Sequence, residues 1–473
     1  MTETNGTETA LQSRAGRVSR KGNASDIMWA AYVVSVALEL WLLPGAPFIP
    51  TAIALILMTV CVLGVYRHTA GWSTTGEAVL IGSAMLISFG LILNVYTYTT
   101  YYGGTDSAPV LFNTDAQRNF TDTMYHLGQS DMRSYYTHGL YPAVIAGIFA
   151  ITGPSITAGI CLSAICTLFT LVCVSSLWVR LTGDRSRAWL CMACTAAVCY
   201  LMMEGTILLK DAWCILAIAM AATGLAKPSG AGGIILGAAG ALMLLVARSN
   251  MILGLIPGAI TFWMASPRKR TETRFYVSAL LVFTAAYIGA EILNWTPMTT
   301  TVIGVNDNDI YFNEERQAGY IETVGNFVEM PLWQRVLAMP FCAVLQFLLP
   351  FPWNYMRDVP FGMFEAYAHF QLPWYLFGGL FIYYLGATWR RSPRPVLACA
   401  LWALLLWLVP VWCFGGTISR YGLMAVPLAA PAVAFTLQDS SRRRSLRIFA
   451  LIFIILLVAS LIVCHHIQSA AMQ

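Results

Sequence analysis

Acidic side chains are concentrated in two hydrophilic regions of this chain, residues 98–137 and 294–332. Together the two regions hold ten of the 23 acidic residues but only three of the 28 basic ones. A carboxylate can accept the proton of an attacking hydroxyl group, so these regions are candidates for general-base chemistry. The aspartates that we single out as catalytic or metal-binding candidates are Asp106, Asp115, Asp122, Asp307 and Asp309.

Cationic side chains stand at separate points, each beside a long apolar run. They are Lys210 with its neighbour Asp211, Arg248, and Arg420 with its neighbour Tyr421. A departing phosphate needs positive charge where its negative charge grows, and an arginine fork or a lysine ammonium supplies it. A divalent cation such as Mg²⁺ or Mn²⁺, held by Asp307 and Asp309, is an alternative source of that charge.

The composition predicts the elements that must position these residues. The chain is 58% hydrophobic and 11% charged, with a mean hydropathy of +0.65, which is far from the values of a soluble globular protein. Fifteen apolar runs approach the roughly 20 residues that a membrane-crossing helix needs. Backbone groups in lipid must be satisfied internally, so we predict an all-α, polytopic transmembrane helical bundle.

The distribution of Lys and Arg predicts how the bundle is threaded. We expect a cytoplasmic tail over residues 1–26, one transmembrane domain over 27–464 and an external tail over 465–473, because basic clusters favour the cytoplasmic side. This arrangement holds if the runs 138–152 and 333–350 are re-entrant or interfacial, leaving about 13 crossings. Both acidic regions are then external loops. The turn with Glu204, Lys210 and Asp211, the turn at Arg248 and the turn before Arg420 are external too.

The order of residues in the first acidic region resembles a known family. An acidic residue outside the membrane, a short amphipathic helix and the aromatic-proline pair Tyr141-Pro142 precede an apolar run. This order resembles the first loop of the GT-C glycosyltransferases, multi-spanning enzymes that use polyprenyl-phosphate-linked sugars. The resemblance implies that Asp115 is the catalytic carboxylate, with Asp106 or Asp122 as substitutes.

Two shorter segments extend the resemblance. Residues 419–427, from Ser419 to Pro427, resemble the Arg-Tyr-x-x-x-x-x-Pro segment of lipid-dependent glycosyltransferases. Lys210-Asp211 followed by Arg248 resembles parts of bacterial polysaccharide-synthesis proteins. The resemblance therefore implies a hexosyl- or pentosyltransferase of the cell envelope that moves a sugar from a polyprenyl-phosphate carrier to a glycan, lipid or protein acceptor.

Each candidate residue also has a structural explanation. Arg420 can extend to the membrane interface, Asp211 can be a favourable first-turn charge of a helix, and Asp115 can cap the helix of the first loop. The acidic residues around Asp307 can form a solvated surface.

Other functions predict different features. The chain has no P-loop or dinucleotide glycine motif, and its basic residues lie between apolar runs, so we expect neither an ATP-driven pump nor a nucleic-acid partner. A Wzy-like polysaccharide polymerase would use the arginines without needing a loop aspartate as base. A flippase or secondary transporter would have paired broken helices with sites at mid-bilayer.

Overall fold

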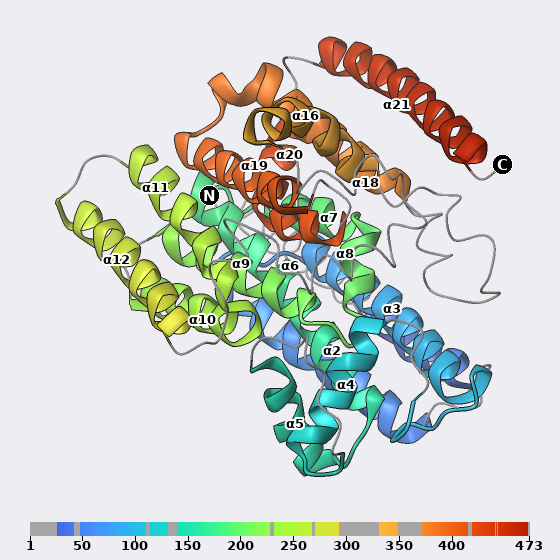
Figure 1. Cartoon of the computed structure of the whole chain (residues 1–473). Helices are drawn as coiled ribbons and strands as arrows, with labels where there is room; N and C mark the ends of the chain where they lie inside the picture. Colours follow the sequence, from blue (N-terminus) through green and yellow to red (C-terminus); the bar gives the residue numbers. More distant parts are fainter. Residues whose placement is uncertain are drawn as a thin grey trace, which may run out of the picture.

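The computed structural model describes most of the chain (Figure 1). The described residues are 26–41, 48–109, 114–130, 140–227, 231–266, 270–292, 331–348, 371–414, 419–439, 441 and 443–471. All regular elements among these residues are helices, and no strand occurs among them, so the predicted all-α class is confirmed for this part of the chain.

The described helices pack as a bundle, and several of the α-helices are separated by short 3₁₀- or π-helical segments. After a helix at residues 26–41, the elements are α2 (Phe48–Arg67), α3 (Thr74–Tyr96), η1 (Thr97–Tyr101), α4 (Thr114–His126), α5 (Tyr141–Thr152), α6 (Ile156–Thr182), α7 (Ala188–Ala196), α8 (Cys199–Glu204), α9 (Asp211–Leu225), α10 (Ala231–Arg248), η2 (Ser249–Gly254), α11 (Leu255–Ala265), α12 (Arg270–Ile292), α16 (Leu332–Leu348), α18 (Gln371–Tyr383), η3 (Tyr384–Thr388), η4 (Trp389–Arg391), α19 (Arg394–Phe414), η5 (Ser419–Ala425), α20 (Val426–Gln438) and α21 (Arg443–Ala471). The helix α4 confirms the short helix predicted within the first acidic region.

Local sequence signals set both ends of the long central helix α6. The Ser155 hydroxyl accepts a hydrogen bond from the amide of Ala158 at 3.1 Å, which satisfies one of the free N–H groups at the start of the helix. At the other end Gly183 adopts a left-handed conformation with φ of 76°, and its amide donates to the carbonyl of Val179 at 2.8 Å. A serine and a glycine thus define a 27-residue helix.

The helices α6 and α9 run side by side in the same direction and form the centre of the molecule (Figure 1). The Thr223 hydroxyl donates to the carbonyl of Cys173 at 3.2 Å, and Arg180 donates to the carbonyl of Thr223 at 2.6 Å. The C-terminal ends of both helices therefore lie together, beside Lys227. We call this the basic end of the bundle, and the end with the N-termini of α6 and α9 the site end.

Glycines bring α10 unusually close to α9. A Cβ atom at Gly224 would lie 2.6 Å from the amide nitrogen of Gly237, and one at Gly240 would lie 2.5 Å from the carbonyl oxygen of Ala217. Small residues at such spacing allow two helix backbones to approach closely. As residue numbers rise along α9 their partners fall along α10, so the two helices are antiparallel and Asp211 is opposite Arg248.

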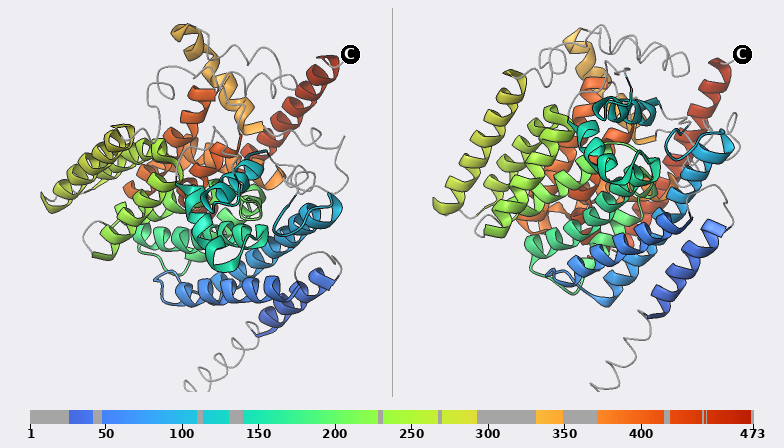
Figure 2. Two further views of the ribbon diagram at one scale, coloured as in Figure 1. Left: turned by 60° about the horizontal axis from the view of Figure 1, so that its bottom comes forward. Right: turned by 90° about the horizontal axis from the view of Figure 1, so that it is seen from below.

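Four described helices are long and apolar enough to cross a membrane: Thr74–Thr100, Ile156–Thr182, Ala231–Arg248 and Arg443–His466. The last of these is almost wholly exposed, with its apolar side chains facing outward, as expected for a surface that contacts lipid. Figure 2 shows α21 and α12 at opposite edges of the molecule. These helices suggest a membrane protein, and the predicted count of 13 crossings stays a prediction.

The sequence pattern was misleading between residues 187 and 203. It is one of the fifteen apolar runs, and its composition predicts one helix, but the structure breaks it at Val198, whose backbone is non-helical with φ of −76° and ψ of 85°. The two pieces, α7 and α8, have 9 and 6 residues. No proline or glycine marks the break in the sequence, so local signals do not reveal it.

Candidate functional site

Three charged residues meet at the site end of the α9–α10 hairpin. Asp211 is the first residue of α9, Lys210 directly precedes it, and Arg248 is the last residue of α10. Arg248 Nη2 lies 3.5 Å from Asp211 Oδ1, with side-chain exposures of 14% and 1%. The Cys214 sulfur, one turn further along α9, lies within electrostatic range of all three.

The segment leading into α9 is buried although its backbone is irregular. Residues 205–209 between α8 and α9 are buried, and the flanking carboxylate of Glu204 is 3% exposed. The segment therefore lies beneath neighbouring elements, and its predicted position on the external side stays a prediction. Buried backbone groups need partners, and side chains from α3 and α4 provide them.

Two asparagines hold this buried segment. Asn94 of α3 donates to the carbonyl of Thr206 at 2.7 Å, and Asn119 of α4 donates to the carbonyl of Leu208 at 3.1 Å. Both asparagines are buried, so water does not compete well for these bonds. They fix the direction from which the chain enters α9, and hence the position of Lys210 and Asp211.

The start of α5 adds an aromatic wall. The rings of Tyr141 and Trp213 meet edge to face with centroids 5.9 Å apart, and Tyr141 lies within electrostatic range of Asp211. The amide of Leu140 donates to the carbonyl of Val246 at 2.9 Å, which ties the start of α5 to the end of α10. The Tyr141-Pro142 pair that follows the first acidic region is thus beside the charged group.

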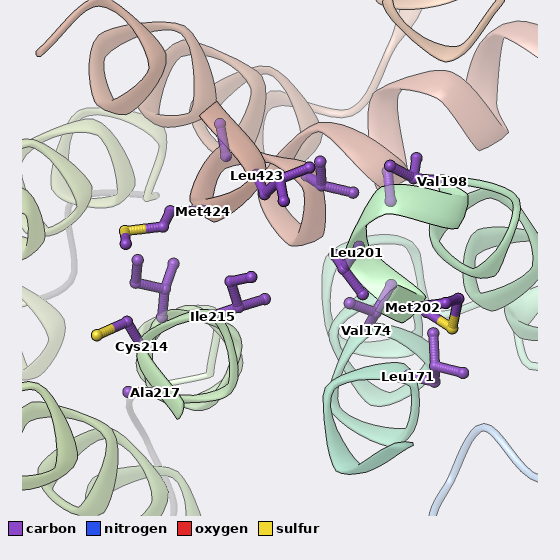
Figure 3. Packing of buried hydrophobic residues seen from close by; sticks show 14 of the residues in the cluster. Leu171, Val174, Val198, Leu201, Met202, Cys214, Ile215, Ala217, Leu423 and Met424 are labelled. Atoms are coloured by element: carbon purple, nitrogen blue, oxygen red, sulfur yellow. The ribbon is translucent and has the colours of Figure 1, made fainter. Parts of the chain in front are cut away.

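The C-terminal motif approaches from the other side of α9. The short helix η5 contains Arg420 and Tyr421 and packs against α9. Figure 3 shows Met424 of η5 beside Cys214 and Ile215 of α9. The backbone of the Arg420 segment therefore lies near the N-terminal part of α9, although residues 210 and 420 are far apart in the sequence.

This arrangement is suited to an anion. The N-terminus of α9 carries a partial positive charge, and Lys210 and Arg248 place two positive charges beside the negative charge of Asp211. The indole N–H of Trp213 is buried and has no acceptor among the described residues. A phosphate group is the ligand that fits such a set of donors.

The three aspartates predicted in the first acidic region have different surroundings. Asp106 is a helix cap: its Oδ1 accepts bonds from the backbone amide and the hydroxyl of Thr157, at 3.1 and 2.6 Å, at the start of α6. Asp115 is the second residue of α4, so the prediction that it is the N-cap is wrong, and its side chain lies outside the described set. Asp122, in the third turn of α4, is 3% exposed.

The remaining predicted residues are not fully described. Asp307 and Asp309 lie outside the described residues, and the side chains of Arg420 and Tyr421 are not described. Within the described part of the chain, no group of three His, Cys, Asp or Glu side chains is arranged to hold a metal ion. The predicted divalent cation therefore stays a prediction.

Sequence reasoning missed the residues that position the site. Asn94, Asn119 and Trp213 were not singled out, because a lone amide or indole carries no motif. For Asn94 the available signal was chemical: an asparagine within a membrane helix is expensive unless it is hydrogen-bonded, so its amide was a candidate for holding backbone. Asn119 lies in the amphipathic helix α4, where a polar side chain gives no such signal.

Comparison of the chain with protein-family models, curated proteins and solved structures gives no match.

Proposed function

We propose that this protein is a GT-C-like membrane glycosyltransferase that takes a sugar from a polyprenyl-phosphate carrier and adds it to a glycan, lipid or protein acceptor. The observation that carries the proposal is the convergence of Lys210, Asp211 and Arg248 at the N-terminus of α9. In this proposal the group binds the phosphate of the carrier, whose polyprenyl chain stays in the bilayer.

The location of the group supports a lipid-linked donor over a soluble one. It lies at one end of a bundle in which four of the described helices are apolar enough to cross a membrane, beside the amphipathic helix α4 and close to the chain that leads from the first acidic region. The chain has no nucleotide-binding motif that would hold a nucleotide sugar.

The distribution of charge supports an external site. Arg180, Arg187 and Lys227 lie at the basic end, together with Arg391, and the charged group around Asp211 lies at the opposite end. Basic residues favour the cytoplasmic side, which puts the site end outside, as in the 13-crossing arrangement with a cytoplasmic N-terminus. The helix α5 begins beside Val246 and is followed by the Asp106 cap of α6, both at the site end, which supports a re-entrant α5.

The proposed roles divide between charge and proton transfer. Lys210 and Arg248 neutralise the phosphate as the bond between the anomeric carbon and the phosphate oxygen breaks, and Arg420 joins them from η5. Asp115, near the start of α4, accepts the proton of the acceptor hydroxyl. Asp211 positions Arg248 through their ion pair.

The proposal is tested first by binding. Lys210→Met and Arg248→Gln should each weaken the binding of undecaprenyl phosphate by purified protein roughly ten-fold, because a charge-assisted bond contributes about 1.5–3 kcal/mol. Arg420→Ala should have a similar effect. The matched control is Arg274→Gln, which removes an exposed arginine of α12.

The second test is sugar transfer. Asp115→Asn should leave a stable, membrane-inserted protein and lower the transfer rate by roughly 10²–10⁴, because loss of a general base has that effect. The first-turn charge that it also removes contributes only about 0.3–1 kcal/mol to stability. Full transfer by Asp115→Asn, together with unchanged carrier binding by the cation variants, would refute the proposal.

One observation favours a transporter of envelope glycans as the second candidate. The break at Val198 and the buried irregular segment before α9 resemble the discontinuous helices of secondary transporters, in which a helix N-terminus faces an anionic substrate. A transporter would bind the carrier and move it across the liposome membrane without transferring its sugar to an acceptor. Transfer of a labelled sugar to acceptor by purified protein distinguishes the two.

A further inference from the structure

The helices α18 and α21 form an antiparallel pair at the edge of the molecule (Figure 1). The rings of Tyr383 and Phe449 have centroids 5.0 Å apart, and a Cβ atom at Gly379 would lie 2.7 Å from the ring of Phe453. The partners on α21 rise in number as those on α18 fall. The end of α18 and the start of α21 are therefore neighbours.

A hydrogen bond and an ion pair fasten these two ends together. Arg391 of η4 donates to the Ser441 hydroxyl at 2.5 Å, and its guanidinium lies 3.9 Å from the carboxylate of Asp439. Ser441 in turn donates to Asp439 at 2.5 Å. The carboxylate of Asp439 therefore already contacts Ser441 and Arg391.

Positive charge remains in excess around this junction. We define the α18–α21 basic patch as the five exposed arginines Arg390, Arg391, Arg443, Arg444 and Arg447. Four of them, all except Arg391, have no ion pair among the described residues, and Asp439 is the carboxylate that the structure places against the patch. The guanidinium of Arg390 lies 5.3 Å from the ring centre of the half-exposed Trp389, an aromatic residue suited to the membrane interface.

Beyond the patch the surface becomes apolar. Leu451 and Ile455 of α21 are 62% and 59% exposed, and Ile382 of α18 is 48% exposed. The surface thus changes from cationic to hydrocarbon-like along one direction. A phospholipid with an anionic head group and two acyl chains matches this surface, because its head group would lie against the cationic part and its chains against the apolar part.

We infer that the α18–α21 basic patch binds the head group of an anionic phospholipid, with the acyl chains along the exposed face of α21. The bound lipid bridges η4 and the start of α21 and holds the peripheral helix against α18. The patch is at the basic end, opposite the proposed carrier site, so it is a second and independent lipid site.

The test compares two double variants that remove equal charge. Arg443→Gln/Arg447→Gln removes two arginines of the patch, and Lys227→Gln/Arg274→Gln removes two exposed basic residues away from α21. Phosphatidylglycerol is added in steps to the full-length protein in neutral detergent, and its binding is measured as the change in thermal unfolding temperature. Phosphatidylcholine with the same acyl chains and inorganic phosphate are tested in the same way as controls.

We expect phosphatidylglycerol to raise the unfolding temperature and phosphatidylcholine to have no such effect. The patch variant should bind phosphatidylglycerol about 30-fold more weakly, since each basic residue near an anionic lipid surface contributes about 1 kcal/mol, or five-fold. The control variant should bind within about three-fold of the unmodified protein. Equal losses in both variants would overturn the inference, because they would indicate general charge attraction.

Two further outcomes are decisive. Competition by inorganic phosphate at concentrations near those of the lipid would overturn the lipid assignment in favour of a free-anion site. The stability of the patch variant gives a second readout, because α21 should be held less firmly against α18 when the lipid is absent. A disulfide between α18 and α21, introduced by Gly379→Cys/Phe453→Cys, should restore the stability of the patch variant without restoring its lipid binding. If the disulfide form regains phosphatidylglycerol affinity, the arginines do not form the binding site.

Discussion

The ion pair between Asp211 and Arg248 offers the sharpest test of the site, through a double-mutant cycle of Asp211→Asn and Arg248→Gln. The two charges are 3.5 Å apart, and the aspartate is 1% exposed. At an effective dielectric constant of about 20, this separation corresponds to roughly 5 kcal/mol of attraction before desolvation is subtracted. Arg248→Gln leaves a buried carboxylate without its cation, which we expect to lower the free energy of unfolding by about 3–5 kcal/mol.

The reverse variant should be milder. Asp211→Asn leaves a guanidinium that is 14% exposed and can turn toward water, so a loss of about 1–3 kcal/mol is expected. The double variant has neither charge, so no uncompensated charge is left buried. Its loss of unfolding free energy should therefore be smaller than the sum of the two single losses by about 2–3 kcal/mol. Total stability is typically about 5–15 kcal/mol, so each of these differences is measurable.

The assay is reversible unfolding in mixed detergent micelles, followed by tryptophan fluorescence. Arg391 and Asp439 provide the matched control, because they are 3.9 Å apart with exposures of 50% and 13%, and a surface pair contributes about 0–1 kcal/mol. A coupling below about 0.5 kcal/mol for Asp211 and Arg248, equal to that of the control, would show that the pair does not order the hairpin end.

Three other predictions concern the fold and its orientation. Gly240→Ala should lower the free energy of unfolding by about 1–3 kcal/mol, because its Cβ would lie 2.5 Å from the Ala217 carbonyl oxygen. The control, Gly232→Ala in the same helix, has open space around its Cβ and should be neutral or stabilising by up to about 1 kcal/mol. Equal effects of the two substitutions would disprove the close packing of α9 and α10. In a background without native cysteines, Gln129→Cys should react with a membrane-impermeant thiol reagent in intact cells and Arg185→Cys should not, and the opposite pattern would invert the proposed topology. Asp106→Ala should destabilise the protein by about 0.5–2 kcal/mol through loss of the α6 cap while sugar transfer continues; a loss of transfer without destabilisation would instead make Asp106 the base.

The sequence by itself determined the class of the fold and the ends of the long central helix α6. Apolar runs near 20 residues predicted the helices, and a local pair such as Ser155 and Gly183 bounds α6 because helix caps act over only a few residues. The candidate cations at 210 and 248 were also identifiable, since charges beside apolar runs are expensive to place without a reason.

Only the tertiary structure decided which of these residues meet. The close approach of α9 and α10 depends on backbone atoms that touch at Gly224 and Gly240, and their register sets Asp211 against Arg248. The burial of residues 205–209 depends on Asn94 and Asn119, which come from helices far away in the sequence. Such contacts join residues about 90 to 110 positions apart, beyond the reach of local propensity, so packing and hydrogen bonding between helices, rather than any pattern along the chain, determine the geometry of the site.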